Sequence, residues 1–65
     1  MTKAEAAEII ALDVRVWARQ HGAPVTKDLV EARMSECRHL GGRKAQAATT
    51  APSWRIVLRI ATKES

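Results

Sequence analysis

The stretch SWRIVLRIATKES, from Ser53 to Ser65, decides the fold that we predict for this chain. Alternation of apolar and other residues is typical of a half-buried β-strand, because successive side chains of a strand point to opposite faces. We therefore predict a strand over residues 54–61. Its inward-facing residues are the large apolar ones at every second position, namely Trp54, Ile56, Leu58 and Ile60.

A helix is the alternative for the same stretch. Pro52 suits the first turn of a helix, because backbone N–H groups there have no hydrogen-bond partner within the helix and proline loses nothing by lacking one. The apolar stripe would then consist of Trp54, Val57, Leu58 and Ala61. A strand, by contrast, needs a neighbour, which would be either the segment 43–49 as a hairpin mate or the same strand of a second subunit.

The segment RKAQAATTAP, residues 43–52, gives two signals at once. Ala45, Ala47 and Thr49 alternate with other residues, as in a weak strand, whereas the composition of RKAQAA favours a helix. The TTAPS sequence that follows is typical of a turn or loop. We predict a loop or weak strand over residues 43–52.

The first helix is predicted over residues 3–20. Thr2 and Glu5 have the spacing of a capping box, and no Gly or Pro interrupts the segment. Gly22 suits the left-handed position that follows a helix, and Pro24 prevents the helix from continuing.

The second helix is predicted over residues 26–40. Thr26 suits its N-cap, and Gly41 and Gly42 end it. Because the connection to the first helix is short, we expect the two helices to form an antiparallel hairpin.

The chain of 65 residues is expected to form a single small domain, residues 1–65. The predicted class is α+β and mainly α, a helical hairpin followed by a β-strand or hairpin; the alternative is an all-α three-helix dimer. Two aromatic residues and many small aliphatic ones make a thin core, which favours a homodimer. The residues expected in the core or dimer interface are Ile9, Ile10, Leu12, Val14, Trp17, Trp54, Ile56, Leu58 and Ile60.

Positive charge is concentrated in the second half of the chain. Residues 1–32 hold four Lys or Arg against five Asp or Glu, whereas residues 33–65 hold seven against two. A basic half favours an anionic partner, such as nucleic acid or an acidic protein surface. The residues predicted to bind it are Arg33, Arg38, Arg43, Lys44, Arg55 and Arg59.

Catalysis and metal binding are not expected. Cys37 is the one cysteine, so the chain cannot form an internal disulfide. His39 lies two residues later, and residues two apart on a helix do not face each other. With His21 as the one further histidine, the chain lacks a usable zinc ligand set. We expect no enzyme activity, no cofactor, no small-molecule substrate and no membrane span. The absence of a signal-like apolar start predicts a cytoplasmic protein with a reduced thiol.

Two short strings, TKDLV at residues 26–30 and GGRK at residues 41–44, resemble the helix-turn-helix and first strand of small phage Cro repressors. That family has a tight turn and two short helices between these strings. Residues 30–40 of this chain contain no Gly or Pro, so we do not assign the chain to that family.

Two functions compete most closely, ahead of a third, an accessory subunit with only a structural role whose basic face is merely solvated. The first is a small DNA-binding regulator of the kind that phages and mobile elements encode, which contacts duplex phosphates through its basic half. Duplex is preferred to single-stranded nucleic acid because Trp54, a possible stacking platform, is predicted to face the core. The second is a small protein-binding inhibitor or adaptor, possibly phage-encoded, that acts as a homodimer on a larger host protein.

Overall fold

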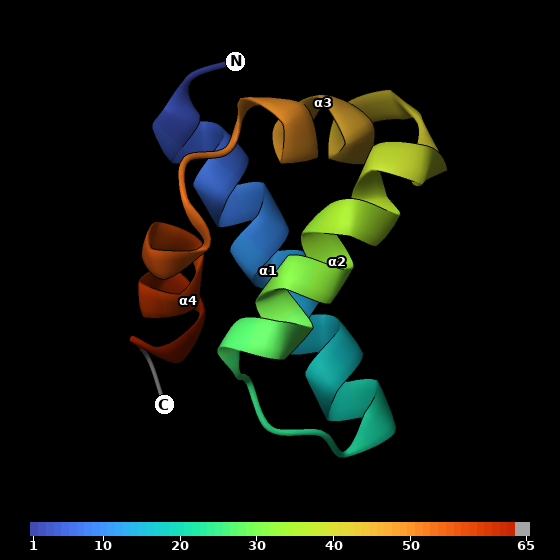
Figure 1. Ribbon diagram of the computed structural model, residues 1–65, viewed down its shortest axis with the longest axis vertical. Helices are drawn as coiled ribbons and strands as arrows, with labels where there is room; N and C mark the ends of the chain where they lie inside the picture. Colours follow the sequence, from blue (N-terminus) through green and yellow to red (C-terminus); the bar gives the residue numbers. More distant parts are fainter. Residues whose placement is uncertain (64–65) are drawn as a thin grey trace.

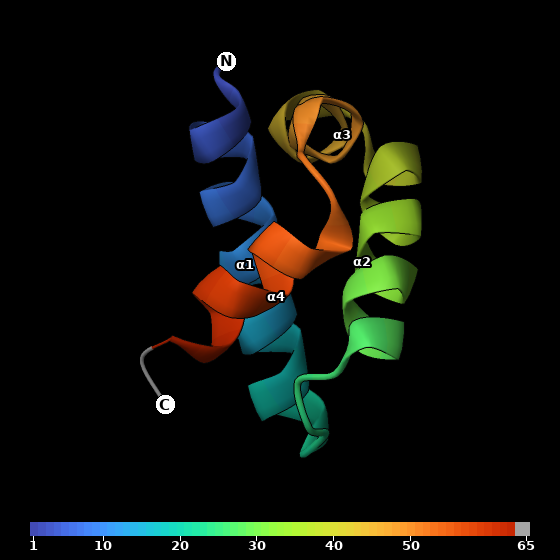
Figure 2. The same ribbon diagram turned by 60° about the vertical axis from the view of Figure 1, so that its left-hand side comes forward.

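The structure, a computed structural model, describes residues 1–63, which hold four α-helices and no β-strand. The two longer helices, α1 and α2, run in opposite directions (Figure 1), and the shorter α3 and α4 each pack against both of them (Figure 2). Both α3 and α4 contact α1 and α2, whereas α3 and α4 do not contact each other within the described residues. The helices span Lys3–His21 (α1), Lys27–Leu40 (α2), Gly42–Thr50 (α3) and Trp54–Thr62 (α4).

The first two helices begin and end within one residue of the predicted bounds. The Thr2 hydroxyl accepts a hydrogen bond from the backbone N–H of Glu5 at 3.1 Å. Thr26 caps α2 in the same way, accepting from the N–H of Leu29 at 3.3 Å. Gly22 has a φ of 61° after α1, a left-handed conformation that glycine adopts at little cost. Local capping signals therefore predict these helices well.

The predicted strand over residues 54–61 is wrong, because this segment is α4. Val57, expected on the outer face, is fully buried, and Ile56, expected inside, is 43% exposed. A helix satisfies its backbone hydrogen bonds within itself, whereas a strand here would have no neighbouring strand in the described chain. The side chains that face the other helices belong to the helical alternative: Trp54, Val57, Leu58 and Ala61.

The predicted loop or weak strand over residues 43–52 is also wrong, because Gly42–Thr50 forms α3. Its alanine-rich composition favours a helix. Gly41 and Gly42 have φ values of 75° and 64°, and this turn redirects the chain between α2 and α3. The α+β class is therefore replaced by an all-helical one, with one helix more than the three-helix alternative.

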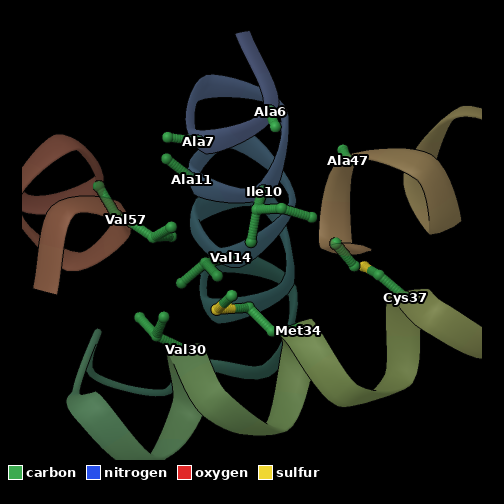
Figure 3. Packing of buried hydrophobic residues seen from close by; sticks show 12 residues of the cluster. Ala6, Ala7, Ile10, Ala11, Val14, Val30, Met34, Cys37, Ala47 and Val57 are labelled. Carbon is green, nitrogen blue, oxygen red and sulfur yellow. The ribbon is translucent and has the colours of Figure 1, made fainter. Parts of the chain in front are cut away.

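The core lies where all four helices meet (Figure 3). Ile10 and Val14 of α1 occupy its centre and are fully buried. Ala7 and Ala11 lie on the side of α1 that faces α4, where small side chains let the two helices approach closely. The other fully buried residues include Val30, Cys37, Ala47 and Val57.

The predicted core set divides into three groups. Ile10 and Val14 are fully buried. Leu12 is 59% exposed, and Ile56 is exposed as described above, so neither belongs to the core of this subunit. The remaining members are half-buried: Ile9, Trp17, Trp54, Leu58 and Ile60.

Candidate functional site

Trp54 is the first residue of α4, and two cations lie close to its ring. The Lys27 ammonium lies 5.0 Å from the ring centroid, and the Arg55 guanidinium carbon lies 5.6 Å from it. Lys27 is the first residue of α2, so the N-terminal ends of α2 and α4 meet at this ring. Cation–π attraction at exposed sites contributes about 0.5–1 kcal/mol and holds both cations near the ring.

A groove of about 240 Å³ opens between α2 and α4 beside the ring, lined by Glu31, Met34, Arg38 and Trp54. We call the groove together with Lys27 and Arg55 the Trp54 surface. It carries three cations, Lys27, Arg38 and Arg55, against one acid, Glu31, and the ring is half-buried. This combination of cations with an apolar face can hold a phosphate and pack against the group that it carries.

The predicted binding residues are distributed over different parts of the molecule. Arg38 and Arg55 lie on the Trp54 surface, and Arg59 is exposed four residues beyond Arg55 on α4. Arg43, at the start of α3, is exposed and lines a different groove, together with Glu5, Glu8, Ile9 and Leu12. Lys27 belongs to the surface but was not predicted, because it lies in the half of the sequence where acidic residues outnumber basic ones.

Arg33 and Lys44 both bind Asp13 of α1, a residue that sequence analysis did not identify. Arg33 donates from Nε to Oδ2 at 2.8 Å and from Nη2 to Oδ1 at 3.2 Å, and Lys44 Nζ donates to Oδ1 at 2.7 Å. The Asp13 side chain is 4% exposed, that of Arg33 15% and that of Lys44 50%. We call these three residues the Asp13 junction; it joins α1, α2 and α3.

The environment of Asp13 favours its charged form. Burial alone would raise the pKa of Asp13, but the hydrogen bonds and positive charges of Arg33 and Lys44 outweigh it and lower the pKa below its ordinary value. The hydrogen bond to Asp13 in turn raises the pKa of Arg33. The single negative charge of Asp13 therefore offsets half of the positive charge of Arg33 and Lys44, and the junction keeps a net positive charge.

The arrangement around Cys37 does not favour nucleophilic chemistry. The thiol is buried, and burial together with the negative charge of Asp13 raises its pKa, so that the reactive thiolate is disfavoured. Across residues 1–63, no three His, Cys, Asp or Glu side chains group as metal ligands would. No helix in that part of the chain has the length and apolar character that crossing a bilayer requires.

Comparison of the chain with protein-family models, with curated proteins and with solved structures finds no match.

Proposed function

We propose that this protein is a small, non-enzymatic nucleic-acid-binding regulator of the cytoplasm that holds duplex phosphates with its Trp54 surface. The observation that supports the proposal is the convergence of Lys27, Arg38 and Arg55 around Trp54, from two different helices. Arg59, on the same helix as Arg55, extends this basic surface by one turn. All four cations are exposed and can reach an anion without unfolding any element.

The mechanism is electrostatic attachment with a local apolar contact. Each Lys or Arg that neutralises a phosphate releases a condensed counterion, so binding weakens steeply as salt rises. Trp54 keeps the neighbouring cations in place and offers part of its ring to the sugar beside the phosphate. Arg33 and Lys44 take little part, since both are hydrogen-bonded to Asp13 and lie outside the Trp54 surface.

Titration of a fluorescent mixed-sequence duplex, followed by anisotropy, tests the proposal. The double variant Arg38→Gln/Arg55→Gln should bind roughly tenfold or more weakly and lower the salt slope by about two, one per lost phosphate contact. The matched control is Lys3→Gln/Arg43→Gln, which removes the same charge from exposed residues outside the Trp54 surface and should bind within about threefold of the parent chain. Equal losses in the two variants, or no binding at low salt, would contradict the proposal.

A protein-binding inhibitor or adaptor is the second candidate, supported by Glu31 and Met34 in the groove. A carboxylate and a thioether do not favour phosphate, whereas a mixed apolar and charged groove suits a protein segment. In this case partners recovered on the immobilised chain would survive nuclease treatment, and Glu31→Lys, at an exposed position of the groove, would release them. Loss of all partners on nuclease treatment would instead leave the first proposal standing.

A further inference from the structure

Within residues 1–63, the outer face of α1 carries an apolar stripe that the other helices leave partly exposed. Leu12 is 59% exposed and Val16 is 47% exposed, and Ile9 is half-buried beside them. These residues are spaced three and four apart, so they share one side of the helix. Together they line a groove of about 410 Å³ that extends to Trp17 and the Asp13 junction. We call Ile9, Leu12 and Val16 the Leu12 face.

Charged residues flank the Leu12 face with opposite signs at its two ends. Glu5 lies seven residues before Leu12, and Arg19 lies seven residues after it, which is about two turns in each direction. Both therefore lie on nearly the same side of α1 as Leu12. The two charges are separated by roughly 21 Å along the helix, too far to pair within one chain. The residues of α1 thus make the face acidic at one end, apolar in the middle and basic at the other end; Arg43 of α3 lines the same groove as Glu5 at the acidic end.

We propose that this face binds a second copy of the chain, with the two α1 helices antiparallel about a two-fold axis beside Leu12. A two-fold interface uses the same patch on both subunits, so the patch must be complementary to its own reverse. Here Leu12 meets Leu12 of the second copy, and Ile9 meets its Val16. Glu5 meets Arg19 of the second copy at both ends, because each lies equally far from the centre.

The charge order selects the antiparallel arrangement over the parallel one. In a parallel pair the glutamates would lie beside each other and so would the arginines, and like charges brought together are unfavourable. The apolar centre supplies the burial, and the end charges set the orientation. The antiparallel pair also explains why α1 is apolar over a wider arc than α2, α3 and α4 cover.

The expected dimer is reversible. A standard interface covers about 800 Å² on each partner, roughly a fifth of the 4325 Å² that this chain exposes. One helix face with three apolar residues makes an interface smaller than this standard one. We therefore expect a micromolar dissociation constant, which corresponds to a free energy of association of about 8 kcal/mol in favour of the dimer. The Leu12 face shares no residue with the Trp54 surface, so the inference does not depend on the proposed function.

Sedimentation of the full chain across a wide concentration range tests the interface. The mass should rise from that of one chain to that of two, and Leu12→Glu should leave only the monomer at all concentrations. The matched control is Ile56→Glu, which changes an apolar residue of similar exposure, 43%, on α4. The control should dimerise like the parent chain, and circular dichroism should show that both variants remain helical.

Charge exchange at the ends of α1 tests the antiparallel orientation. Glu5→Arg and Arg19→Glu should each weaken self-association, by roughly tenfold, because each places like charges opposite each other twice. An equimolar mixture of the two variants should restore the dimer, since every end pair then joins opposite charges. Three results would overturn the inference: a parent chain that stays monomeric, a Leu12→Glu variant that still dimerises, or a mixture that associates no better than its components.

Discussion

The helices α3 and α4 are each nine residues long and pack against the same two longer helices, yet different interactions hold them. The buried residues of α3 are the alanines Ala47 and Ala48, and Lys44 ties the helix to the buried Asp13. Val57 and Ala61 of α4 are buried, with Trp54 packed against the core from its first turn. A helix with little apolar bulk is thus fixed by a polar contact, whereas one with larger side chains is fixed by burial.

The two modes of attachment have different energetics. Complete burial of a valine side chain stabilises the fold by about 1.5–3 kcal/mol, and the gain depends little on orientation. A buried ion pair gains little net stability when it forms, because desolvation offsets the attraction, but losing one partner costs several kcal/mol. The loss of unfolding free energy from substitutions in α4 should therefore scale with the burial of the replaced side chain. The loss from substitutions at the Asp13 junction should depend on which charged group remains without its partner.

Val57→Asp should have the largest effect on stability. It places a charge at a fully buried position and should cost at least about 4 kcal/mol, a large part of the roughly 3–10 kcal/mol expected for a chain of this size. Ile56→Asp, at the adjacent exposed position, should cost less than about 1 kcal/mol. Urea unfolding followed by circular dichroism measures both. If residues 54–61 formed a strand, Ile56→Asp would lose more unfolding free energy than Val57→Asp. Comparison of the two variants therefore distinguishes a helix from a strand.

The contrast between α3 and α4 also shows what a sequence of this length can predict. The helices α1 and α2 were found because Thr2, Thr26 and Gly22 act locally, within one turn of the residues that they cap. The segment of α4 is apolar at positions that suit both a strand and a helix, so its periodicity could not decide. The neighbouring segment decides between the two, because it forms α3 and a strand over residues 54–61 would therefore have no partner strand.

The candidate site was predicted only in part, for a related reason. Arg38 and Arg55 were identified from charge, which needs no knowledge of the fold. Lys27 joins them only because the starts of α2 and α4 meet. The contacts of Asp13 with Arg33 and Lys44 span 20 and 31 residues, so no local pattern distinguishes these two cations from free surface charges.

Asp13→Asn should have the next largest effect. It leaves the Arg33 guanidinium, on a side chain that is only 15% exposed, without its carboxylate and should cost about 3 kcal/mol. Asp28→Asn removes an exposed carboxylate from the first turn of α2 and should cost about 0.5 kcal/mol through the helix dipole. The same urea titrations measure the free energies of unfolding. Equal costs for the two variants would show that the junction contributes no more than a surface charge.

The effect of Asp13 should depend on pH. Its pKa in the folded chain lies below the value of about 3.9 that an unfolded chain would have, so the unfolded state takes up protons first as pH falls. The stabilisation is fully present above the unfolded pKa and is lost as pH falls through the folded pKa. The difference in unfolding free energy between the parent chain and Asp13→Asn should therefore be constant near neutral pH and narrow below about pH 4. A difference that stays constant down to pH 2 would exclude this coupling.

Lys44→Gln should have the smallest effect and isolates the contact that holds α3. The Lys44 side chain is half exposed, so water competes with Asp13 for its ammonium, and the loss should be at most about 1 kcal/mol. Arg43→Gln, the neighbouring substitution at an exposed position outside the Asp13 junction, should change stability by less than about 0.5 kcal/mol. Amide hydrogen exchange should show faster opening of α3 in Lys44→Gln than in Arg43→Gln, with α4 unaffected in both. Equal acceleration in α3 and α4 would mean that the two helices open together and that the polar contact gives α3 no separate anchoring.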